Sequence, residues 1–177
     1  SSVLDINMKD GSKKDYRFYG GLGLISSRLT AEGPIVEDKG SFIVSGRRTY
    51  ADIFFPLFNE EQLDNSTLYF YDLKAKLNYQ LDHDNRFFLS AYNGRDIFNF
   101  DDEFGFDWGN TTATMRWNHI VSEKLFSNTT IMYSEYNYDI NVQDADQSAT
   151  ISSGIKDWHL KGDLQYFYTS NSTYKFG

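Results

Sequence analysis

The sequence predicts an all-β protein, an antiparallel up-and-down meander of about eight or nine long strands. Apolar and polar residues alternate over stretches well beyond the roughly 5 to 6 residues of an ordinary strand. Asn, Asp and Gly separate these stretches at fairly regular intervals, and helical periodicity is nearly absent. No apolar run approaches the roughly 18 residues of a transmembrane helix, so a helical membrane protein is excluded.

The clearest strand is Thr67–Leu81, in which Tyr69 and Tyr79 lie near the two ends of an alternating segment. One face carries Tyr69, Tyr71, Leu73, Ala75, Leu77, Tyr79 and Leu81, and the other carries Asp72, Lys74, Lys76, Asn78 and Gln80. Ten steps of about 3.3 Å, tilted by about 40°, rise about 25 Å, the height of the apolar band of an outer-membrane barrel. We therefore expect lipid on one face and an aqueous lumen on the other, so that the meander is part of a transmembrane β-barrel.

Seven further strands, and the start of a ninth, follow from the same pattern and its turn residues. In chain order we expect strands at Tyr16–Ile25, Ser27–Pro34, Ser41–Phe54, Thr67–Leu81, Arg86–Asn99, Thr111–Val121, Phe126–Val142 and Ser148–Tyr168, with a ninth beginning at Tyr174. In strand 41–54, Arg48 shares the apolar face and would extend its charge to the membrane interface. In strand 86–99 the register is weakly specified, because placing Arg95 in the lumen turns Phe88 outward and Leu89 inward.

The remaining strands alternate as well. In strand 111–121, Ala113, Met115, Trp117 and Val121 face lipid, opposite Thr112, Thr114, Arg116 and Asn118. In strand 126–142 we expect Met132, Tyr136, Tyr138 and Ile140 to face lipid, opposite Glu135, Asn137, Asp139 and Asn141. In strand 148–168 the lipid face holds Trp158, Leu160, Gly162, Leu164 and Tyr166. Aromatic rings near the ends of a lipid-facing band form a girdle that anchors the band at the membrane interfaces. We assign this role to Tyr69, Tyr79, Trp117, Trp158 and Tyr166.

The predicted connections differ in length on the two sides of the sheet. Short turns at Val36–Gly40, Asp82–Asn85, Ser122–Lys124 and Asn171–Thr173 alternate with Pro56–Ser66, Asp101–Asn110 and the shorter Asp144–Gln147. Outer-membrane barrels have short periplasmic turns and longer outer loops, so the second set is expected outside the cell. On the loop 101–110, Phe104, Phe106 and Trp108 are candidate ligand contacts; packing of the loop against its neighbours is the alternative.

Charged residues give weaker signals. We expect Arg47, Arg95 and Arg116 to face the lumen or a plug, and we favour ordinary charge pairing within a polar lumen over contact with a ligand or plug. The acidic residues of loop 101–110 lack the spacing of a calcium loop, and the three His residues lack the spacing of a zinc hydrolase or a Ser-His-Asp triad. We therefore expect no metal, no cofactor and no enzyme. A net charge of -8 argues against binding nucleic acid, and zero Cys removes thiol chemistry.

Three segments resemble a known family. SSVLDINMKDG is similar to the end of the N-terminal plug of TonB-dependent outer-membrane receptors. GLGLISSRLTAEGPI and GSFIVSGRRTYAD resemble the first barrel hairpins of the large receptor branch whose members often carry a carboxypeptidase-regulatory-like domain. The resemblance implies a barrel of about 22 strands closed around a plug, in the outer membrane of a Gram-negative cell. It also implies import of a scarce nutrient powered by the TonB complex.

On this resemblance, residues 1–12 end the plug and residues 13–177 begin the barrel. The TonB box, most of the plug and most of the strands would lie outside this sequence. The expected partners are outer-membrane lipid, a nutrient ligand such as a siderophore, vitamin, oligosaccharide or peptide, the TonB complex, and a surface lipoprotein. Two alternatives stay open: a complete eight-stranded outer-membrane barrel of structural or adhesive type, and a soluble β-sandwich that binds carbohydrate.

Overall fold

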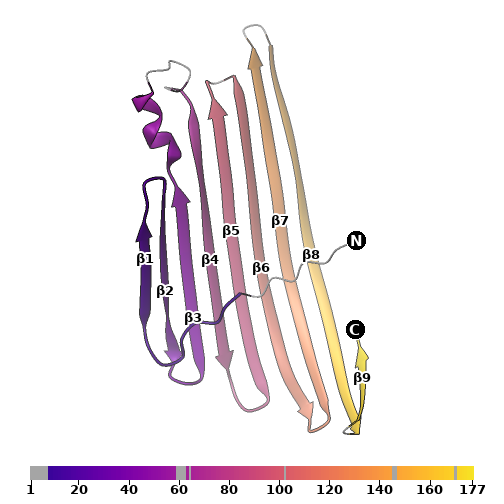
Figure 1. The fold of residues 1–177 in the computed structure, drawn as a ribbon. Coiled ribbons are helices and arrows are strands. Elements are labelled where there is room, and N and C mark those ends of the chain that lie inside the picture. Colours follow the sequence, from indigo (N-terminus) through magenta and orange to yellow (C-terminus); the bar gives the residue numbers. More distant parts are fainter. Residues whose placement is uncertain (1–7, 59–62, 64, 102, 145–146, 170) are drawn as a thin grey trace.

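The strands form a single nine-stranded antiparallel sheet in which each strand pairs with the next one along the chain (Figure 1). The computed structural model describes residues 8–58, 63, 65–101, 103–144, 147–169 and 171–177. The predicted all-β meander is confirmed. The described strands make an open sheet, with β1 at one edge and β9 at the other.

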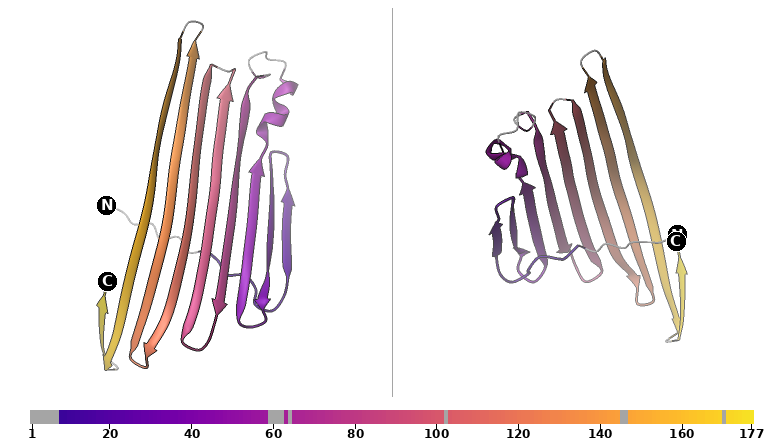
Figure 2. Two further views of the ribbon diagram at one scale, coloured as in Figure 1. Left: turned by 180° about the vertical axis from the view of Figure 1, so that it is seen from behind. Right: turned by 45° about the horizontal axis from the view of Figure 1, so that its top comes forward.

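The strands lengthen from the first to the eighth, except that β3 is one residue shorter than β2. Their bounds are β1 (Arg17–Leu22), β2 (Ser26–Val36), β3 (Gly40–Thr49), β4 (Thr67–Gln80), β5 (Asn85–Phe100), β6 (Phe104–Ser122), β7 (Leu125–Asp144), β8 (Gln147–Thr169) and β9 (Ser172–Phe176). One 3₁₀ helix, η1 (Ala51–Leu57), follows β3. The sheet is therefore tall at β7 and β8 and short at β1, as both views in Figure 2 show.

Two expected boundaries are wrong. The strand predicted to reach Phe54 ends at Thr49, because the segment with Pro56 turns into η1 instead. The loop predicted over Asp101–Asn110 is mostly strand: β6 begins at Phe104 and pairs with β5 up to Phe100. The turn between them is tight, with the N–H of Glu103 donating to the carbonyl of Phe100 at 3.0 Å.

The sheet is one layer thick and has no apolar core of its own. No hydrophobic residue in the described part of the chain is buried; the buried side chains that are polar or charged are Glu32, Ser41, Asp72 and Asn78. A soluble sheet normally buries one face against a second layer. Both faces of this sheet therefore need cover from outside it.

Part of that cover comes from the N-terminal segment. Residues 8–14, here called the strap, cross one face of the sheet at its lower end (Figure 1). We call this the strap face and the opposite one the belt face. The predicted plug segment, residues 1–12, lies outside the described residues up to residue 7, so only residues 8–12 of it can be placed.

The turn between β4 and β5 shows how the short connections are held. Oδ1 of Asp82 accepts hydrogen bonds from the backbone N–H groups of Asp84 at 2.9 Å and Asn85 at 2.7 Å. It also accepts from the side-chain amide of Asn85, at 2.9 Å. That amide bond, aided by the two backbone bonds, lowers the pKa of Asp82. A predicted tight turn at 82–85 is thus present, fixed by its own aspartate.

The lowered pKa predicts a pH-dependent gain in stability over Asp82→Asn, which keeps the acceptor but cannot ionise. The gain should be present above the ordinary pKa of aspartate and should disappear as the pH falls through the lowered pKa of the folded protein. Denaturant midpoints of the wild-type and Asp82→Asn proteins, compared across this pH range, measure it. A difference that stays constant with pH contradicts the prediction.

Candidate functional site

The belt face carries continuous rows of apolar side chains that cross almost the whole sheet. One row consists of Phe18, Ala31, Val44, Ala75, Ala91, Ala113, Tyr133 and Trp158. The next row down contains Phe42, Leu77, Leu89, Met115, Ile131 and Leu160. Many of these side chains are exposed, Trp158 to 73% and Leu160 to 77%. We call this apolar zone the belt.

The belt does not follow the rows but crosses them obliquely. Glu135 and Lys156 form an ion pair, at 2.9 Å, in the same row as the apolar Leu73 of β4. Lower down, the row of the apolar Leu164 on β8 contains the polar His119 on β6. The apolar zone therefore moves toward the lower end of the sheet between β4 and β8.

The register of the strands gives the angle by which they tilt relative to the belt. On β4 the belt runs from Tyr69 to Tyr79, and on β8 it runs from Trp158 to Tyr166. Tyr79, the lower end on β4, shares a row with Gly162, the centre on β8. The centre thus shifts by about five residues over about four strand intervals; at about 3.3 Å per residue and 4.8 Å between strands, the strands tilt by about 40° from the normal to the belt.

The structure brings the predicted girdle residues to one face. The register puts Tyr69, Tyr79, Trp117, Trp158 and Tyr166 all on the belt face. Trp117 also stacks on Phe87, with ring centroids 5.9 Å apart, and its indole N–H donates to Asn85 at 3.0 Å. Their anchoring role stays a prediction, since it depends on what covers the belt.

Two register expectations are wrong. On β7, Met132, Tyr136, Tyr138 and Ile140 lie on the strap face, because the belt crosses this strand lower down and ends at Tyr133. On β5, Leu89 belongs to the belt and Phe88 to the strap face. Arg95 consequently lies on the belt side, above the belt, where it pairs with Asp107 at 2.6 Å.

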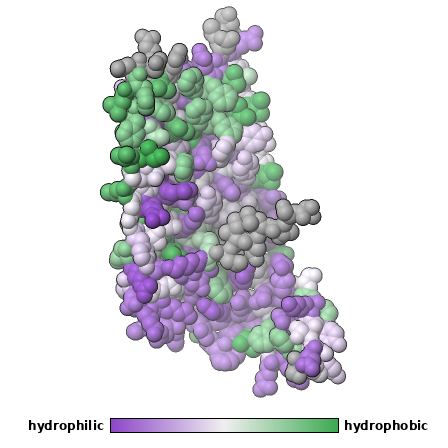
Figure 3. Space-filling view, viewed as in Figure 1, coloured by the Kyte–Doolittle hydropathy of each residue, from purple (hydrophilic) through white to green (hydrophobic). Residues whose placement is uncertain are grey.

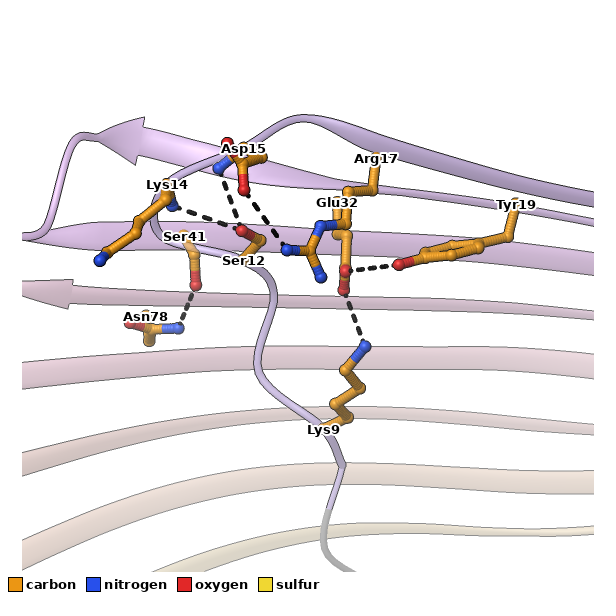
Figure 4. Close-up of polar contacts among 9 residues, drawn as sticks. All are labelled: Lys9, Ser12, Lys14, Asp15, Arg17, Tyr19, Glu32, Ser41 and Asn78. Carbon is orange, nitrogen blue, oxygen red and sulfur yellow. Dashed lines mark hydrogen bonds and ion pairs between the residues drawn. The ribbon is translucent and has the colours of Figure 1, made fainter.

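The strap is held on the opposite face by ion pairs and by backbone contact. Lys9 pairs with Glu32 at 3.1 Å, and Glu32 also accepts from Tyr19 at 3.2 Å (Figure 4). Asp10 pairs with Lys76 at 2.7 Å. Gly11 lies so close to β3 that a Cβ there would sit 2.0 Å from the carbonyl oxygen of Phe42. Only glycine fits, so the strap is seated directly on the sheet.

The other two predicted lumen arginines lie on the strap face. Arg47 donates to Asp72 at 2.7 Å, and Lys74 lies 3.4 Å from the same carboxylate. Arg116 lines a hollow of ≈ 560 Å³ beside Lys161 and Asp163. The strap face is polar and ionic below its upper end, and purple residues dominate the lower half of Figure 3.

Aromatic side chains return at the upper end of the strap face. Phe104, Phe106 and Trp108 lie here, on strand β6 and not on the loop where they were expected. The rings of Phe106 and Trp108 meet edge to face with centroids 4.2 Å apart, and the indole N–H of Trp108 donates to Asp96. Figure 3 shows a hydrophobic zone across the upper end of this face. A flat ring held by a carboxylate beside it can stack on a ligand.

Sequence reasoning missed Glu32 and Asp10, which fix the strap. A signal for Glu32 was present, because Arg28, Thr30 and Glu32 alternate with Leu29, Ala31 and Gly33. Nothing local indicates Asp10, whose partners Lys76 and Arg86 lie far away in the sequence.

Comparisons with family models, curated proteins and solved structures find no match to this chain. Among the described residues, no three His, Asp or Glu side chains are grouped to hold a metal ion. None of the helical residues described makes a segment long and apolar enough to span a bilayer.

The fit of Gly11 gives a test of the strap. Gly11→Val should displace it, since the new Cβ would collide with backbone that cannot move aside. Trypsin should then cleave at Lys9, Lys13 and Lys14 severalfold faster than in the wild-type protein. Gly162→Val is the control, because nothing lies within 4 Å of a Cβ at Gly162. Equal cleavage of both variants contradicts the seating of the strap.

Proposed function

We propose that this chain is the N-terminal part of the barrel of a TonB-dependent outer-membrane receptor, with the last segment of its plug. The observation that carries the proposal is the belt: an exposed apolar zone whose normal lies about 40° from the strands. Strands of outer-membrane barrels tilt by about 35–45°. A flat bilayer cutting across tilted strands produces such a slant.

The strap supports the lumen side of the proposal. A barrel interior is polar, and a plug inside it needs polar contacts. The strap meets that need through Lys9 and Asp10 with Glu32, Lys76 and Arg86. In the resembling family, the segment before the first barrel strand leaves the plug inside the barrel. The strap occupies the corresponding place, before β1 and on the ionic face.

We assign ligand capture to the upper part of the strap face. The short turns and the strap lie at the lower, periplasmic end, so the ring patch of Phe104, Phe106 and Trp108 lies at the outer mouth of the lumen. A nutrient entering from outside would meet these rings before the plug. The TonB complex and a surface lipoprotein would act through segments outside this chain, and we assign the chain no reaction.

The belt can be tested with single spin labels, because the chain contains no Cys. In full-length protein in nanodiscs, labels at Leu77, Met115 and Leu160 should be accessible to oxygen, which concentrates in lipid. Labels at Lys74, Thr114 and His159, on the opposite face of the same strands, should instead be accessible to a polar nickel chelate. The alternation follows from the two faces of each strand.

Two observations, one from this experiment and one from the isolated chain, would overturn the proposal. Labels on the belt shielded from both reagents indicate a protein layer over it, as in a soluble sandwich. A chain of 177 residues that folds alone in detergent to a closed monomer indicates a small complete barrel instead.

The ring patch predicts a ligand phenotype. Siderophores, cobalamin, oligosaccharides and peptides would each be tested as the sole source of a limiting nutrient for cells carrying the full-length receptor. For the compound that supports growth, Trp108→Ala should weaken binding to the purified receptor by about tenfold, the effect of losing one buried ring. Phe87→Ala, on the belt face, should leave binding unchanged. Equal loss in both variants contradicts a role for the patch.

A further inference from the structure

A wide hollow lies on the belt face, over the upper ends of β1 to β4. Its volume is ≈ 1040 Å³, and its lining includes Leu22, Leu29, Tyr71 and Leu73. Leu22 is 91% exposed and Leu29 63% exposed, so these apolar walls are open to the outside. Neither the strap nor the ring patch shares this surface, and the proposed transport route does not use it.

Glycines form the floor of the hollow. Gly20 and Gly46 lie in one cross-strand row with Leu29 between them. A Cβ at Gly20 would meet only Leu29 at an ordinary 3.8 Å and the backbone of Arg28 at 3.9 Å. Packing therefore leaves room for a side chain at Gly20. Its absence keeps a groove open between the apolar side chains of this part of the belt.

A positive charge stands at the upper rim. Arg48 lies in the row of Leu22 and Tyr71, with its guanidinium 5.0 Å from the ring centroid of Tyr69. In the described part of the chain no carboxylate lies within ion-pair distance of Arg48, whereas neighbouring Arg47 pairs with Asp72. Within the described residues, Arg48 is thus a cation stacked on a ring and without an anionic partner.

We propose that this hollow binds one anionic lipid of the surrounding leaflet, with an acyl chain on the glycine floor and the phosphate on Arg48. The inference rests on the proposed function, since it needs lipid at the belt. The hollow is continuous with the belt, which favours an acyl chain as its occupant. The charge at its interfacial end complements an anionic headgroup. An arginine beside tyrosines at the end of a lipid-facing band lies at headgroup depth.

The test uses full-length protein in nanodiscs of phosphatidylcholine with a minor fraction of phosphatidylglycerol, followed by native mass spectrometry of retained lipid. Wild-type protein should retain phosphatidylglycerol preferentially. Arg48→Gln should reduce that preference about fivefold, the effect of one interfacial cation. Gly20→Leu should reduce retention of both lipids, because it fills the groove. Arg116→Gln on the opposite face and Gly162→Leu elsewhere on the belt are the matched controls.

The outcomes separate the two proposals. Insertion into nanodiscs with the same lipid retention in Arg48→Gln as in Arg116→Gln overturns the lipid site alone. Failure of the wild-type protein to insert overturns the lipid site and the proposed function together.

Discussion

A single sheet that buries no apolar side chain, within the part of the chain described, must be covered on both faces by something other than itself. Burying apolar surface drives folding, and here the surface available for burial faces outward. The two faces of the sheet need different environments. The belt needs an apolar environment without specific partners, whereas the strap face needs hydrogen-bond donors and charges in fixed positions. The strap provides the latter at Glu32 and Lys76, which it neutralises.

Strand length and belt height together define how the sheet is used. About 9 to 11 tilted residues are enough to cross a bilayer, yet β7 has 20 residues and β8 has 23. The belt occupies only the lower part of these strands. Above it, the belt side turns ionic, with Arg95 on Asp107 and Lys156 on Glu135. The long strands thus extend beyond the apolar zone into a region where their outer side suits water.

Structural features that depend on neighbouring residues could be predicted from the sequence, whereas features that depend on distant residues could not. Thr67–Leu81 alternates without interruption, so its strand and both faces were predicted correctly. β5 and β7 change polarity partway along, where the belt ends, and a pattern that assumes one apolar face per strand assigns the wrong register. The segment 104–110 has Gly and Asp at turn-like spacing, but pairing with β5 outweighs these local preferences. The salt bridges of Asp10 join distant residues, and no local pattern could reveal them.

The polarity of the sheet inverts along its height, and the inversion constrains what the upper end can do. On the belt side, apolar residues give way upward to ions, while on the strap side ions give way upward to the rings of Phe106 and Trp108. If the upper strands merely extended into water, rings on either side would cost solubility without gain. In the proposed barrel, rings on the inner side alone would be protected by closure and would meet whatever enters the mouth. A lipid-facing belt and an inward ring patch are therefore two consequences of the same proposed geometry, and a protein layer over the belt would remove the reason for both.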